Sequence, residues 1–144
     1  RLSEAREWLG KLASMDHTYR VPMYRYMIAL AAGETEAAEA LLHELETMEG
    51  QEWSLSALLG DICTMRQEYD KAIAWYRKAQ ELQPSPKYTD SAESIAHICE
   101  IRGDTAGAVS AYREKQRLLR EEWGIVSGEV YEETERSIQR LLAL

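Results

Sequence analysis

Apolar residues recur at spacings of three and four along most of the chain, the period that places them on one side of an α-helix. Ala72, Tyr76 and Ala79 are one such stripe, and Pro84 and Pro86 then prevent the helix from continuing. The pattern predicts helices at residues 2–14, 19–32, 35–48, 52–66, 69–82, 88–102, 105–121 and 127–143.

The helical pattern also repeats. The clearest copy begins at Trp53, and its landmark residues are Leu59, Gly60, Ala72, Tyr76, Ala79 and Pro84. Ala38 lies 34 residues before Ala72, and Ala108 lies 36 residues after it, so the linker at residues 85–88 is expected to hold a small insertion. Leu42 and Tyr112 then occupy the position of Tyr76 in the neighbouring copies. Three copies in register indicate a repeat protein.

Turn residues follow the same register. Gly33 and Gly103 stand where Gln67 stands in the clearest copy, and each is followed by an acidic residue. Gly33, Gly50, Gly103 and Gly124 are predicted to form turns or helix C-terminal caps, because glycine tolerates the left-handed backbone found there.

The order and spacing of these residues resemble the tetratricopeptide repeat, which is about 34 residues long. The resemblance implies an all-α fold, a superhelix (solenoid) of antiparallel helix pairs with a C-terminal capping helix. We expect a single domain over residues 1–144, with a partial repeat at 1–18, repeats at about 19–52, 53–88 and 89–122, and the cap at about 127–143. Such a chain is predicted to be a binding module, not an enzyme.

Small residues are expected where paired helices cross closely. The positions concerned are Gly60, Ala72, Ala79, Ala96 and Ala108. Larger side chains should fill the space between repeats, namely those of Leu42, Trp75, Tyr76 and Tyr112. In the last helix, Val130, Ile138, Leu141 and Leu142 are predicted to share the packed side.

The first predicted helix has an apolar stripe without an evident partner. The stripe consists of Leu2, Ala5, Trp8, Leu9 and Leu12. It resembles the second helix of an earlier repeat, and because the chain starts at Arg1 inside a helical pattern we expect a fragment of a longer protein. If this stripe completes the stack of another copy, the chain forms a homodimer or larger assembly.

Composition narrows the possible partners. Hydrophobic residues make up 45% and charged residues 29%, which is ordinary for a globular protein. The net charge of -8 repels phosphate backbones, so direct contact with nucleic acid is not expected. No signal peptide and no apolar stretch of membrane-spanning length is visible, and two cysteines are too few for a secreted scaffold. We therefore expect a cytoplasmic protein without membrane contact.

Candidate chemistry is sparse. His17, His43 and His97 lie in different repeats, and no metal-binding, phosphate-binding or nucleophile motif is present, so we expect no catalytic residues, metal or cofactor. Cys63 and Cys99 occupy the same position in adjacent repeats, too far apart for a disulfide, and are predicted to be small buried apolar residues. A redox switch is the alternative.

A binding groove is predicted on the first helix of each pair, the side that lines the concave surface of such solenoids. Its apolar end would hold Arg20, Met23, Met27 and Leu30. The groove would continue through Ser54, Ala57, Asp61, Thr64 and Met65. Its acidic end would hold Asp90, Glu93, His97 and Glu100. Methionines suit adaptable apolar recognition, and the acidic end favours Lys or Arg on a protein or peptide ligand. Met23 and Met27 could equally be core residues, because periodicity does not distinguish groove from core.

The C-terminal stretch supplies a second resemblance. The residues on which this resemblance rests are Arg102, Gly103, Asp104, Ala108, Tyr112, Glu122, Trp123 and Gly124. They are similar to the end of tetratricopeptide sensor domains attached to bacterial helix-turn-helix transcription regulators. That resemblance implies the regulatory part of a transcriptional regulator, with a peptide, another protein or a second copy as ligand. An accessory interaction domain of some other larger protein remains an alternative.

Overall fold

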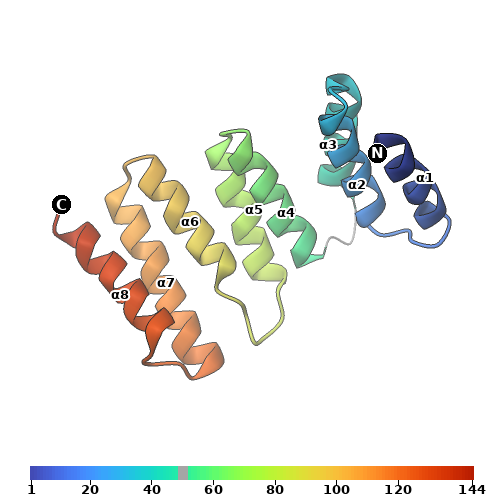
Figure 1. Cartoon of the computed structure of the whole chain (residues 1–144). Coiled ribbons are helices and arrows are strands. Elements are labelled where there is room, and N and C mark those ends of the chain that lie inside the picture. Colours follow the sequence, from blue (N-terminus) through green and yellow to red (C-terminus); the bar gives the residue numbers. More distant parts are fainter. Residues whose placement is uncertain (49–51) are drawn as a thin grey trace. The chain divides into compact units, whose positions relative to one another are not determined.

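The computed structural model describes residues 1–48 and 52–144, and every regular element within these ranges is an α-helix. In chain order they are α1 (Leu2–Ala13), α2 (Arg20–Ala31), α3 (Thr35–Thr47), α4 (Trp53–Met65), α5 (Tyr69–Leu82), α6 (Asp90–Ile101), α7 (Thr105–Trp123) and α8 (Glu129–Leu142) (Figure 1). All eight predicted helices are confirmed, and their ends differ from the prediction by two residues at most. The turn predicted at Gly50 lies outside the described residues.

The chain divides into two compact units, Arg1–Gln51 and Glu52–Leu144, called unit 1 and unit 2 below. In unit 1, α1 packs on α2 and α2 packs on α3. In unit 2, each of the helices α4 to α8 packs on the next, and they lie side by side in chain order (Figure 1). Consecutive packing of helix pairs confirms the predicted all-α, tetratricopeptide-like solenoid class. The single domain and its repeat bounds stay a prediction.

Equivalent turns have the same backbone geometry in both units. Gly33, Gln67 and Gly103 all adopt positive φ, at 73°, 61° and 71°. In each turn the next residue donates its N–H to a carbonyl five positions back: Glu34 to Ala29, Glu68 to Cys63 and Asp104 to Cys99, at 2.8 to 2.9 Å. This hydrogen bond closes a helix end. The predicted register of the turns is therefore confirmed.

Close helix crossings depend on the small residues that the repeat places there. Gly60, Ala72, Ala79, Ala96 and Ala108 are all buried, as predicted. At Gly60 the approach of α5 is so close that a Cβ atom would lie 2.6 Å from Cε1 of Tyr76. The α4–α5 crossing therefore requires glycine at this position.

The C-terminal cap corrects one prediction. Ile138 and Leu141 are buried, but Val130 and Leu142 are exposed. The buried side of α8 instead includes Thr134, whose hydroxyl donates to the carbonyl of Val130 at 2.8 Å. Because α8 is the last helix and packs mainly on α7, its buried stripe is narrower than its apolar pattern suggests.

None of the helices in residues 1–48 and 52–144 has the length and hydropathy needed to span a bilayer. Cys63 and Cys99 are both buried and are not joined to each other by a disulfide, which confirms the prediction that they pack as small apolar residues. Burial raises the pKa of the Cys99 thiol, so the neutral form predominates.

Candidate functional site

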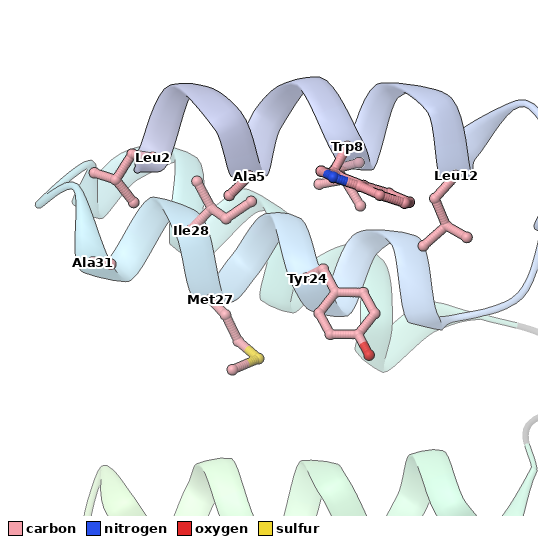
Figure 2. Close-up of a pocket in the computed structure, with 9 residues that line it drawn as sticks. Leu2, Ala5, Trp8, Leu12, Tyr24, Met27, Ile28 and Ala31 are labelled. Atoms are coloured by element: carbon pink, nitrogen blue, oxygen red, sulfur yellow. The ribbon is translucent and has the colours of Figure 1, made fainter.

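An apolar hollow lies between α1 and α2 in unit 1. It has a volume of about 470 Å³ and is lined by Leu2, Ala5, Trp8, Leu9, Leu12, Tyr24, Met27, Ile28 and Ala31, referred to below as the apolar hollow. Figure 2 shows its side chains along both helices, with Trp8 and Leu12 on α1 and Tyr24 and Met27 on α2. The three-and-four spacing of both helices places these residues on one side each.

Large apolar groups in this hollow are open to solvent. Trp8 is 73% exposed and Met27 is 55% exposed, whereas Leu9, which also lines the hollow, is buried. An exposed apolar patch of this kind marks a surface for binding, because covering it removes hydrocarbon from water. Tryptophan provides a large rigid contact, and methionine adapts its shape to the partner.

The apolar end of the predicted groove coincides with this hollow in part. Met27 lines it, whereas Arg20, Met23 and Leu30 do not. Met23 is half-buried, and Arg20 and Leu30 are exposed. The groove prediction omitted the residues that α1 contributes, because the α1 stripe was assigned to an earlier repeat or to the stack of another copy. The signal that could have located them was the stripe itself, which includes an exposed tryptophan.

A second hollow lies within unit 2, between the start of α4 and the start of α6. It has a volume of about 140 Å³ and is lined by Trp53, Ala57, Asp61, Tyr76, Gln83, Tyr88, Asp90, Ser91 and Ser94, referred to below as the aromatic hollow. Three residues of the predicted groove, Ala57, Asp61 and Asp90, meet here. Sequence reasoning missed Trp53 and Tyr88, which come from a helix start and a loop.

Two carboxylates of the predicted acidic end are already paired within the protein. Glu93 accepts a hydrogen bond from Nζ of Lys115 on α7 at 3.1 Å. Glu100 accepts from Nη2 of Arg140 on α8, at 2.6 Å. Asp90 makes no ion pair within the described residues. The negative charge open to a ligand is therefore concentrated at Asp61 and Asp90, beside the aromatic hollow.

Tyrosine hydroxyls at equivalent positions hold the helix pairs of unit 2 together. Tyr76 donates to Oδ1 of Asp61 at 2.5 Å, and Tyr112 donates to Oε2 of Glu100 at 2.6 Å. Burial and the hydrogen bond to Asp61 raise the pKa of Tyr76 to about 12. Burial and the Glu100 carboxylate likewise raise the pKa of Tyr112. Both hydroxyls therefore stay protonated donors at neutral pH, and they orient Asp61 and Glu100.

Two further groove residues, Thr64 and His97, have structural contacts. The hydroxyl of Thr64 donates to the carbonyl of Gly60 at 2.8 Å. His97 is exposed, and its ring meets Tyr112 edge-on at 6.2 Å between centroids. The described ranges contain no group of three or more His, Cys, Asp or Glu side chains placed to hold a metal ion.

Comparison with known proteins identifies a partial relative. No protein-family model matches the chain. The Cell division cycle protein 27 homolog A of Arabidopsis thaliana is similar to it, with 33% identity over 87 residues, or 60% of this chain. The match spans only 12% of that protein, so the chain is similar to a small part of it.

Proposed function

We propose that the chain is a protein-interaction module and that the apolar hollow binds the apolar side of a partner peptide or helix. The observation that carries this proposal is the exposure of Trp8 and Met27 in a hollow of about 470 Å³ lined by apolar side chains. Helix-in-groove recognition uses anchors of this kind, in which hydrocarbon on the ligand replaces water. The partial relative is a cell division cycle protein by name, and the similarity to it also supports an interaction role.

A displayed peptide library tests the proposal directly. Peptides selected against the chain should bind Met27→Lys at least about tenfold more weakly, because a charge in the hollow must be desolvated. Met15→Lys is the matched control, since Met15 is 80% exposed and does not line the hollow. Equal affinities for both variants, or equal losses, would contradict the assignment of the hollow as the binding site.

Self-association is the second candidate. The apolar hollow would accept a second copy as well as a foreign partner. Residues 1–31 around it carry five Lys and Arg against three Asp and Glu, whereas the whole chain has a net charge of -8. This segment is therefore opposite in charge to the chain as a whole, which favours contact between copies. Sedimentation over a range of concentrations separates the two functions. A mass that rises with concentration, and no longer rises in Trp8→Glu, would favour assembly of copies over binding of a foreign peptide.

The regulatory context is also a proposal. The resemblance of residues 91–142 to bacterial sensor domains supports a role as the ligand-binding part of a helix-turn-helix transcription regulator in the cytoplasm. In this role the described helices of the chain would make no direct contact with DNA. Sequencing the coding region upstream of Arg1 tests this. A basic helix-turn-helix pattern there would support the regulator, and a catalytic domain would contradict it.

A further inference from the structure

The aromatic hollow of unit 2 has a wall formed by the rings of Trp53 and Tyr88, and Trp123, which does not line the hollow, packs against Tyr88. The ring centroids of Trp53 and Tyr88 are 5.9 Å apart, and those of Tyr88 and Trp123 are 5.6 Å apart with an interplanar angle of 28°. Tyr88 is 50% exposed, so part of this residue is open to a ligand. Rings from α4 and the α5–α6 connection therefore line the hollow, and a ring from α7 supports Tyr88.

Hydrogen bonds hold this wall in place before any ligand arrives. Nε1 of Trp123 donates to the carbonyl of Lys87 at 2.7 Å, and the N–H of Tyr88 donates to Oε1 of the buried Gln83 at 2.9 Å. A site whose side chains are already fixed loses little conformational entropy on binding. The backbone that carries Tyr88 is thus fixed before a ligand binds.

Charge on the hollow is negative and uncompensated. Asp61 uses Oδ1 to accept from Tyr76, and Asp90 makes no ion pair within the described ranges. Lys87 is the cation of the neighbouring loop, and its Nζ is turned to the carbonyl of Gln80 at 2.6 Å. The start of α6 adds about half a positive charge, which is smaller than the two carboxylate charges together. The hollow therefore attracts a cation.

We propose that the aromatic hollow binds one arginine side chain of a partner protein. Guanidinium stacks on aromatic faces and pairs with carboxylates, and it is more weakly hydrated than an ammonium group, so this combination favours arginine over lysine. A volume of about 140 Å³ suits one side chain, since sites for whole small molecules are about 300–1,000 Å³. The inference deepens the proposed protein-binding role by naming a residue type that the partner presents to unit 2.

The test titrates the intact chain with N-acetyl-arginine amide and follows the indole N–H signals of Trp53 and Trp123 by NMR. N-acetyl-lysine amide and N-acetyl-citrulline amide are the comparison probes, because citrulline keeps the shape of arginine without its charge. We expect saturable shifts with the arginine probe, weaker binding of the lysine probe and no saturation with the citrulline probe. Equal responses to arginine and citrulline would overturn the proposal.

Two variants and one control variant localise the effect. Asp90→Asn should weaken arginine binding by about tenfold, whereas Glu129→Gln, which removes a carboxylate from the first turn of α8, should leave it unchanged. Trp53→Leu should weaken it without a change in net charge. Equal weakening by Asp90→Asn and Glu129→Gln would show general attraction to an acidic protein and reject the site. Peptides that still bind the apolar hollow in a Met27-dependent way would leave the proposed function standing if the arginine probe fails.

Discussion

Gln67 occupies a backbone position at which the two equivalent turns carry glycine. Its φ of 61° lies close to the 73° and 71° of Gly33 and Gly103. A residue with a Cβ atom adopts this left-handed region at a cost of roughly 1–2 kcal/mol. The α4–α5 turn therefore contains local strain that the other two turns avoid.

Gln67→Gly should stabilise the protein. Relief of the left-handed strain exceeds the extra entropy that glycine gives the unfolded chain, so we expect a gain of about 0.5–1 kcal/mol in the free energy of unfolding. Urea unfolding followed by circular dichroism measures this. The reciprocal change, Gly103→Gln, should lose about 1 kcal/mol. A loss of stability in Gln67→Gly would mean that the glutamine side chain makes a contribution larger than the strain.

At the scale of paired helices, the contact between Gly60 and Tyr76 sets the distance between α4 and α5. The Tyr76 ring cannot easily move aside, because its hydroxyl is held by Asp61 at 2.5 Å. Gly60→Ala would place a methyl group 2.6 Å from that ring, and overpacking of this kind typically costs about 1–3 kcal/mol. We expect a loss in that range in thermal or urea unfolding.

A double-mutant cycle checks the cause. In a Tyr76→Leu background the added methyl group no longer meets a ring, so Gly60→Ala should become nearly neutral. Ala96 stands 36 residues after Gly60 and is fully buried in α6, which shows that the equivalent pair tolerates a methyl group at this position. If Gly60→Ala costs the same in both backgrounds, contact with Tyr76 is not the reason that glycine is required.

A pH-dependent contact joins three helices through Glu100. Burial alone would raise the pKa of this carboxyl, but hydrogen bonds from Tyr112 and Arg140 outweigh it and lower the pKa below the ordinary 4.5. A lowered pKa in the folded state means that Glu100 stabilises the protein above pH 4.5 and that this contribution disappears as the pH falls through the folded pKa.

Glu100→Gln should therefore flatten the acid side of the stability curve. We expect the variant to be less stable than the parent at pH 7 and to approach it as the pH drops below about 4. Urea unfolding at pH 7, 5 and 3.5 measures the difference. A gap that widens toward low pH would show that the carboxylate destabilises the fold.

Periodicity and turn chemistry predicted the helices well, for a physical reason. Each interior helix of unit 2 is covered by neighbours, so its apolar stripe and its buried side coincide, as at Ala72 and Tyr76. At the ends this relation fails: Val130 and Leu142 are apolar yet exposed, and the α1 stripe faces a hollow. An apolar stripe shows that one side of a helix is suited to burial, but it does not show that another helix packs on that side.

The candidate sites were predicted less completely for the same reason. Asp61, Asp90 and Met27 were assigned from helix faces and do line hollows. Trp53 and Tyr88 escaped prediction because a helix start and a loop have no periodic pattern. Glu93 and Glu100 were expected to be open to a ligand, yet they pair with Lys115 and Arg140. These partners lie 22 and 40 positions further along the chain, and a local sequence pattern does not reveal contacts over such separations.

On the scale of the whole molecule, the two units differ in the extent of their cores. Unit 2 contains a continuous cluster of buried residues that extends from α4 to α8, from Cys63 to Leu141. In unit 1, α1 contributes Leu9 as its single buried residue. Because opening a helix with few buried contacts costs little free energy, the protein should not be uniformly stable.

Hydrogen exchange should therefore show slow amides in α6 and α7, faster ones in α2 and α3, and the fastest in α1. Equal rates in all of these helices would instead indicate one cooperative body, as the single-domain prediction expects.

A peptide selected for the apolar hollow should protect α1 in particular, because it binds the folded helix and not the opened one. At a peptide concentration one hundred times its Kd, the stabilisation of that local opening is about 2.7 kcal/mol, a slowing of roughly one hundredfold. Met27→Lys should abolish the added protection, while Met15→Lys should retain it. If the peptide protects α6 and α7 and leaves α1 unchanged, the ligand binds unit 2, and the exposed Trp8 does not mark the binding site.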